Sequence, residues 1–270
     1  MRMRPRVLRA LLSVLMLFVL DTGLAMAAPP DAGRADGKAL SVFTAASLRD
    51  VFTALGTTFE REHPGTKVQF NFAGSQELRT QLEQGAPADV FASADNKHMD
   101  AARKAGLVDA PTILTTNVPV IVVPADNPAK VASLKDLANV KRLVIGTPEV
   151  PIGTYTLQIL EKAKAQYGAD FPAKVQSRVA SRELNVRQVL TKVTLGEADA
   201  GIVYRTDARS AGDKVKVVEI PSELNVLAEY PIATVTKAPH PDLARAWVTL
   251  VTGPAGQAAL KDAGFGPASK

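Results

Sequence analysis

The sequence predicts an α/β protein with two lobes. Short apolar runs of four to six residues alternate with longer segments of helical periodicity, a pattern typical of βαβ units around a mostly parallel sheet. Two segments interrupt this alternation, the proline-bracketed run 119–124 and the stretch 227–231. We therefore expect the chain to cross twice between two α/β lobes. The cleft between them is the first place to look for a ligand, because small-ligand sites often lie at domain interfaces.

The first lobe is expected to begin with an apolar strand at 40–43. The helix predicted at 48–62 has Val51, Leu55 and Phe59 on one face, which is the spacing of an amphipathic helix. The other elements expected before the first crossing are a strand at 68–72, a helix at 76–84, a strand at 89–92 and a helix at 97–105.

The second lobe is expected to begin at the first crossing segment. Its predicted elements are strands at 119–124, 143–146, 200–204 and 215–220, and helices at 133–138, 154–167 and 186–195. After the second crossing, a strand at 232–235 and helices at 241–251 and 254–262 are expected to return to the first lobe. This assigns 39–118 plus 230–270 to lobe 1 and 119–229 to lobe 2.

The N-terminal segment 1–27 has the features of a cleaved signal peptide. Four arginines precede an apolar core at 11–20, and Ala25-Met26-Ala27 provides the small-x-small cleavage pattern. The apolar run ends at Asp21 after about ten residues, whereas a membrane span needs about 20. Residues 28–38 are small, polar and rich in Pro and Gly, which predicts a disordered mature N-terminus.

The chain contains no cysteine, which excludes disulfides, thiolate catalysis and a lipid-modified cysteine anchor. Together with the signal peptide, this predicts a soluble protein of the periplasm. The formal charge of +5 includes +3 from residues 1–27, which leaves +2 for the mature chain. So small a charge gives no reason to expect a nucleic acid or a membrane surface as partner.

The sequence lacks the familiar signatures of hydrolases, nucleotide-binding enzymes and zinc proteases. Its three histidines, His63, His98 and His240, are far apart and next to turns or Lys-rich segments, so we expect them at the solvated surface. The sequence therefore predicts a protein that is not an enzyme, with no catalytic residues, no cofactor and no metal held directly by side chains.

Polar residues or glycines recur where a strand leads into a helix. The segments 44–47 and 73–75 do so in lobe 1, and 150–153 and 185–186 precede helices of lobe 2. Helix N-termini offer unpaired backbone N–H groups and a partial positive charge, so they can hold an anion. Ser47 and Ser75 could instead be ordinary N-caps that bond their own helices, and position alone does not decide between the two roles.

Six segments, in order and spacing, resemble the periplasmic molybdate-binding proteins of ABC transporters. They are VFTAASL (42–48), FAGS (72–75), GAPADVFASAD (85–95), VPIGTY (150–155), NVRQVL (185–190) and GEADAGIVYRTDA (196–208). The GAPAD run together with GIVY-x-x-DA is the specific part, and the resemblance covers 39–266. It implies the periplasmic-binding-protein fold, two α/β lobes joined by a two-segment hinge with the ligand cleft between them.

Carried over position by position, the resemblance implies a set of molybdate-binding residues. Ser47 and Ser75 would each provide a hydroxyl and a backbone N–H, Ile152 and Val186 a backbone N–H, and Tyr204 a phenolic O–H. Ile152 stands where the family usually has alanine, and Gln76 replaces a smaller polar residue and adds a possible donor.

Asp89 and Asp207 also belong to the family pattern. Their carboxylates would repel an anion, so we expect them to have structural roles, such as accepting bonds from helix or loop amides.

Molybdate is an unprotonated tetrahedral dianion that only accepts hydrogen bonds, which suits hydroxyl and amide donors. The resemblance thus implies capture of molybdate, and also of tungstate, by a monomer that delivers it to the membrane permease of an ABC importer. Molybdenum would be present only as the oxyanion. The alternatives are a receptor for another oxyanion such as tungstate, sulfate or chromate, an exported enzyme, or a sensor module.

Overall fold

The computed structural model describes residues 38–268, which belong to one compact unit. The predicted signal peptide at 1–27 lies outside the described residues, as does the predicted N-terminal tail at 28–38 apart from Lys38. Lys38 already belongs to the first strand, which therefore includes two residues before its predicted start at residue 40. Within 38–268, no helix combines the length and the apolar character that crossing a membrane requires.

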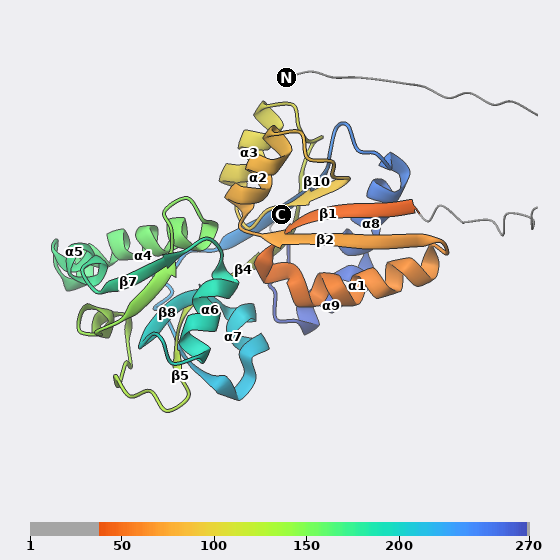
Figure 1. The fold of residues 1–270 in the computed structure, drawn as a ribbon. Helices are drawn as coiled ribbons and strands as arrows, with labels where there is room; N and C mark the ends of the chain where they lie inside the picture. The colour runs from red at the N-terminus through yellow and green to blue at the C-terminus, as the bar shows by residue number, and fades with distance from the viewer. Residues whose placement is uncertain (1–37, 269–270) are drawn as a thin grey trace, which may run out of the picture. The chain divides into compact units, whose positions relative to one another are not determined.

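The first sheet has the strand order β2-β1-β3-β10-β4 (Figure 1). Its strands are β1 (Lys38–Ala45), β2 (Thr66–Ala73), β3 (Val90–Ala92), β4 (Thr112–Asn117) and β10 (Ala228–Thr234). The associated helices are η1 (Ala46–Leu48), α1 (Arg49–Glu62), α2 (Ser75–Glu83), α3 (Asn96–Lys104), α8 (Pro241–Thr252) and α9 (Pro254–Asp262).

The second sheet has the strand order β7-β6-β8-β5-β9. Its strands are β5 (Pro119–Pro124), β6 (Leu143–Gly146), β7 (Val179–Glu183), β8 (Ala200–Tyr204) and β9 (Val215–Val218). The helices on this side are η2 (Leu134–Ala138), α4 (Pro151–Tyr167), α5 (Phe171–Gln176), α6 (Val186–Thr194), α7 (Arg205–Ala211) and η3 (Gly212–Lys214). The division into 39–118 plus 230–270 and 119–229 stays a prediction in its exact boundaries.

Both sheets are mixed but mostly parallel, as expected, since in each of them four strands run one way and one strand runs the other way. In the first sheet β1 runs parallel to β2 and β3, but β10 runs antiparallel to β3 and β4. In the second sheet β5 runs antiparallel to β8 and β9. The reversed strands are those at the crossings, because a chain that returns from the other lobe enters the sheet from the opposite end.

The crossing segments lie side by side and form the hinge. β4 continues into β5 through Val118 alone, and β10 pairs with β4 so that Ala228 lies opposite Asn117. Two adjacent segments that each lead from one lobe to the other allow the lobes to move about a common line. They also bring residues of β4 and β10 close to the cleft.

The core of the first lobe occupies both faces of its sheet. Alternate residues of β1 point to opposite faces, so Leu40 and Val42 join the cluster under α1, while Phe43 joins a smaller one with α2 and α3. Trp247 of α8 is fully buried and makes edge contacts with the rings of Phe52 and Phe59. This packing holds the strand ends, and the helices that follow them, in a constant position.

Candidate functional site

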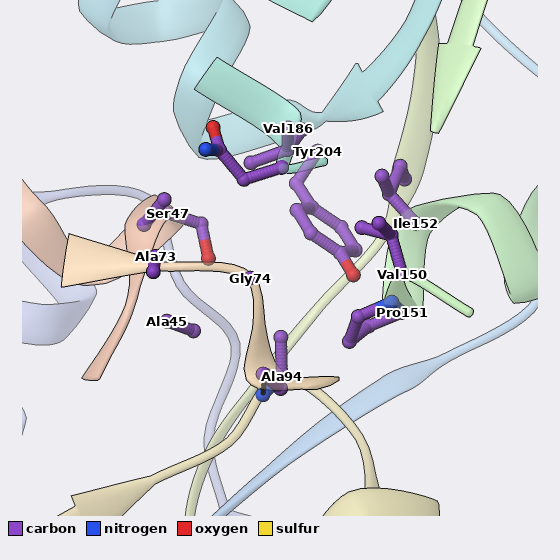
Figure 2. Close-up of a pocket in the computed structure, with 13 residues that line it drawn as sticks. Ala45, Ser47, Ala73, Gly74, Ala94, Val150, Pro151, Ile152, Val186 and Tyr204 are labelled. Atoms are coloured by element: carbon purple, nitrogen blue, oxygen red, sulfur yellow. Dashed lines mark hydrogen bonds between the residues drawn. The ribbon is translucent and has the colours of Figure 1, made fainter. Parts of the chain in front are cut away.

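A small cavity lies where helices of both lobes meet, with a volume of about 10 Å³. A volume of this size is about that needed for a single water molecule, so the cavity excludes ligands the size of a sugar or a peptide. Figure 2 shows Ser47 and Gly74 from the first lobe on one side of it and Tyr204 and Ile152 from the second on the other. The residues that line it are Ala45, Ala46, Ser47, Ala73, Gly74, Ser75, Ala94, Val150, Pro151, Ile152, Asn185, Val186 and Tyr204.

All five residues predicted to bind the ligand line this one cavity, namely Ser47, Ser75, Ile152, Val186 and Tyr204. They come from η1, α2, α4, α6 and the end of β8. Each is at most 4% exposed. The structure therefore brings together residues that are up to 157 positions apart in the chain.

Neither serine acts as an N-cap. The N-cap of η1 is Ala45 and that of α2 is Gly74, so Ser47 and Ser75 lie inside the helical turns. The Ser47 hydroxyl shares a hydrogen bond of 2.9 Å with the Tyr230 hydroxyl, and Ser75 Oγ accepts one of 2.9 Å from the Ala94 amide. The capping role that the sequence left open is thus excluded for both residues.

Two backbone amides of the second lobe have the position that anion binding requires. α4 begins at Pro151, three residues earlier than predicted, so the Ile152 amide lies in the first turn, where it has no partner in its own helix. The Ile152 side chain is fully buried in the core. At the start of α6 the Asn185 side chain caps the Gln188 amide, which leaves the Val186 amide for a ligand.

The Tyr204 hydroxyl is buried and has no hydrogen-bond partner among the described residues. Burial raises the pKa of Tyr204 well above its ordinary value, so the phenol keeps its proton and remains a donor. Its ring packs edge-on against Tyr155 and Tyr230, which fixes the position of the phenolic oxygen. A buried donor without an acceptor is costly, and an anion in the cavity would remove that cost.

The cavity favours an anion although no charged side chain lines it. Among the described residues that line it, none carries a charged side chain. The N-terminal turns of α2, α4 and α6 all contribute to its wall through Ser75, Ile152 and Val186. Three helix N-termini with their partial positive charges therefore meet around the same small space.

The two family aspartates are structural, as predicted, but in different ways. Asp89 accepts hydrogen bonds from the backbone amides of Ser41 and His240, at 2.8 and 2.6 Å. Asp207 is fully buried, and one of its oxygens lies 2.6 Å from Nε of Arg187. Desolvation raises the pKa of Asp207 to about 6, and the charge of Arg187 opposes this rise. Arg187 could not be predicted as its partner, because the two side chains meet only in the fold.

Several contacts join the lobes at the rim of the cavity. Gln76 is not a donor to the cavity, because its Nε2 donates to the Leu184 carbonyl across the cleft at 2.8 Å. His98 was predicted at the surface, but it is 3% exposed and its Nε2 lies 2.8 Å from the Glu149 carbonyl. The error arises because the helix carrying His98 faces the other lobe, which local sequence does not reveal.

Arg187 provides a further contact between the lobes, directly after Val186. Its guanidinium lies 2.6 Å from Asp50 of α1 in the first lobe as well as 2.6 Å from Asp207 in its own lobe. A residue adjacent to the cavity thus connects the two lobes.

Among residues 38–268, no cluster of three or more His, Asp or Glu side chains has the arrangement of a metal site.

Comparison with known proteins gives the chain a family. The sequence profile described as "Bacterial extracellular solute-binding protein" matches residues 40–266. A molybdate-binding protein of Mycobacterium tuberculosis is 44% identical over 230 residues, 84% of each chain. Its counterpart in Escherichia coli is 37% identical over 211 residues, 74% of this chain and 79% of the other.

A solved structure with a similar fold is the periplasmic molybdate-binding protein of Azotobacter vinelandii. It is 21% identical, covers 84% of this chain and 98% of its own, and superimposes with a TM-score of 0.73. This likeness bears on the fold alone, and it confirms the two-lobed architecture. The resemblance stated from the sequence is confirmed by the relatives. The chain belongs to the family of bacterial extracellular solute-binding proteins.

Proposed function

We propose that the protein is a periplasmic substrate-binding protein that captures molybdate and delivers it to the permease of an ABC importer. The observation that carries the proposal is the buried Tyr204 hydroxyl, which points into a cavity lined by other donors and lacks an acceptor within the described residues. The relatives named as molybdate-binding proteins support the choice of ligand. Tungstate, which matches molybdate in charge and shape, is expected to bind as well.

The donor set explains which anions are accepted. Hydroxyls of Ser47, Ser75 and Tyr204 and amides of Ile152 and Val186 can all donate, and each can meet an oxygen that carries no proton. A hydrogen phosphate has a proton that needs an acceptor, so a cavity of donors leaves it unpaired at a cost of about 1–3 kcal/mol. Sulfate has the same charge as molybdate and is smaller, so it must be distinguished by fit.

Binding, and no reaction, is the proposed activity. The lining residues include no His, Asp, Glu or Lys within the described part of the chain, so the serines have no general base in the cavity to activate them. Export through a cleaved signal peptide, the absence of a lipid anchor and a monomeric state remain part of the proposal.

Calorimetry with purified protein tests the ligand. One molybdate per chain is expected to bind and to stabilise the fold by about 2.7 kcal/mol when free ligand exceeds Kd a hundredfold. Tungstate is expected to bind comparably, while sulfate and phosphate bind much more weakly. Sulfate binding as tightly as molybdate would contradict the assignment of molybdate and leave the fold and the anion site intact.

Replacing Tyr204 by phenylalanine tests the donor that carries the proposal. A hydrogen bond to a charged group is worth about 1.5–3 kcal/mol, so Tyr204→Phe is expected to weaken molybdate binding by about ten- to a hundredfold. The melting temperature without ligand should stay the same or rise, because the substitution removes a buried donor that has no protein partner. Tyr167→Phe is the control, since Tyr167 packs on Phe171 at the far end of α4. Unchanged affinity in Tyr204→Phe would show that the phenol does not touch the ligand.

A further inference from the structure

The hydroxyl of Ser47 has a protein partner behind it. The oxygens of Ser47 and Tyr230 lie 2.9 Å apart, and both side chains are buried. A hydroxyl can donate one hydrogen bond and also accept, so the distance alone leaves open which of the two oxygens gives its proton. The answer matters because Ser47 can donate to an anion only if its own proton is free.

Tyr230 stands on the hinge strand β10, beside the end of β4. Burial raises the pKa of Tyr230 well above its ordinary value, and hydrogen bonds with Ser47 and Asn117 lower it in part. The phenol is therefore protonated at neutral pH and has one proton to donate.

The surroundings of the Tyr230 hydroxyl decide where that proton goes. Among the described residues, the acceptor within hydrogen-bond distance of the phenol is Ser47 Oγ, at 2.9 Å. If Ser47 were the donor in this bond, the buried Tyr230 proton would be left without an acceptor, which is costly. Tyr230 is therefore the donor and Ser47 Oγ the acceptor.

We propose that Tyr230 is a positioning residue whose O–H donates to Ser47 Oγ and thereby directs the Ser47 proton into the cavity. The inference rests on the proposed function, which makes an oxyanion the acceptor of that proton. The donors then run in one direction, from Tyr230 through Ser47 to the anion. The residue that orients the ligand donor belongs to the hinge and does not touch the ligand.

Ser75 has an equivalent arrangement on the other side of the cavity. Its Oγ accepts from the Ala94 amide at 2.9 Å, and a backbone N–H cannot reverse its role. Both serine hydroxyls therefore accept a hydrogen bond from the protein and donate their own proton towards the cavity. The donor to Ser47 is a phenol, and the donor to Ser75 is a backbone amide. At Ser75 the donor is main chain and cannot be removed by substitution, whereas at Ser47 it is a side chain and the arrangement can be tested.

Directed donors also account for discrimination against protonated anions. Ser47 could accept the proton of a hydrogen phosphate only if its own proton turned away from the cavity, and the Tyr230 proton already occupies the space behind it. Without the Tyr230 hydroxyl, Ser47 is free to turn and can accept. Removing that hydroxyl is thus expected to weaken molybdate binding more than phosphate binding.

The experiment is a double-mutant cycle on the full chain, with molybdate affinity as the readout. Tyr230→Phe alone is expected to weaken binding about three- to tenfold, the effect of one neutral hydrogen bond. Ser47→Ala alone should weaken it more. The double variant should bind like Ser47→Ala, because Tyr230 acts through Ser47 and the two effects then fail to add. Tyr167→Phe again serves as control. Competition with inorganic phosphate tests the discrimination: in Tyr230→Phe, a lower phosphate concentration than in the wild type should displace half of the bound molybdate.

The possible results distinguish a failure of the positioning role of Tyr230 from a failure of the proposed molybdate-binding function. If the wild-type protein binds no molybdate, the proposed function fails and the inference with it. If the wild type binds and Tyr230→Phe binds within twofold of it, only the positioning role is overturned. Effects of the two substitutions that add fully would also overturn it, because they would show that Tyr230 acts on binding independently of Ser47. A drop in melting temperature with unchanged affinity would make Tyr230 a purely structural residue.

Discussion

Gly74→Ala is expected to weaken molybdate binding by about tenfold to a hundredfold while leaving the ligand-free fold almost unchanged. Gly74 has φ −67° and ψ 144°, an ordinary extended conformation that alanine adopts without strain. The main obstacle is the other lobe, because a Cβ at this position would lie 2.3 Å from the Leu184 carbonyl oxygen. The Gln76 side-chain amide would also lie 2.4 Å from it, but a flexible side chain can move aside. Relieving such an overlap costs about 1–3 kcal/mol, and it is relieved when the lobes move apart.

The measurements for Gly74→Ala are molybdate affinity, thermal stability and the compaction that molybdate causes in small-angle X-ray scattering. We expect reduced compaction in the variant and full compaction in the wild type. Gln76→Ala is the matched control, since it removes the hydrogen bond to the same Leu184 carbonyl without adding bulk and should cost only a few-fold in affinity. Wild-type affinity and full compaction in Gly74→Ala would show that the approach of Leu184 is not needed for binding.

Local patterns in the sequence predicted most of the fold. The strands at 119–124, 143–146 and 200–204 are observed with the predicted bounds, because each is a continuous apolar run between polar or proline residues. β7 (Val179–Glu183) was missed: it carries the polar residues Ser181, Arg182 and Glu183 and lies at the edge of its sheet. Its pairing with β6 defines it as a strand, and pairing is not visible in one sequence.

The candidate site was predicted as a set of residues but not as a set of contacts. Helix N-termini are recognisable locally, so the segments 44–47, 73–75, 150–153 and 185–186 could be singled out. The family resemblance then assigned the individual residues within them. Their partners could not be predicted, because the Tyr230 that bonds Ser47 is 183 positions away and the Leu184 that faces Gln76 is 108 positions away. Such contacts depend on how two lobes meet, which periodicity does not encode.

Arg187→Ala is expected to lower the free energy of unfolding by about 3–5 kcal/mol at pH 8, because it leaves the buried carboxylate of Asp207 without its charged partner. Asp207 is fully buried, and Arg187 lies against it at 2.6 Å. Because desolvation raises the folded-state pKa of Asp207 to about 6 from the ordinary 3.8, the folded protein binds this proton more tightly than the unfolded chain. Ionisation of Asp207 therefore opposes folding, and this cost grows as the pH rises from about 4 through 6.

Without Arg187 the pKa of Asp207 should rise further, so the stability deficit of Arg187→Ala should widen between pH 5 and pH 8. Chemical denaturation at several pH values measures this, and Asp207→Asn in the Arg187→Ala background should recover much of the loss at pH 8. Arg205→Ala is the control, since Arg205 pairs with Glu219 through side chains that are 46% and 58% exposed and should cost at most about 1 kcal/mol. A deficit independent of pH would mean that Arg187 stabilises the lobe by packing and not by its charge. Asp50→Asn removes only the contact of Arg187 with the first lobe. If this variant binds molybdate more weakly but is as stable as the wild type, the ion pair between Arg187 and Asp50 serves to hold the lobes closed.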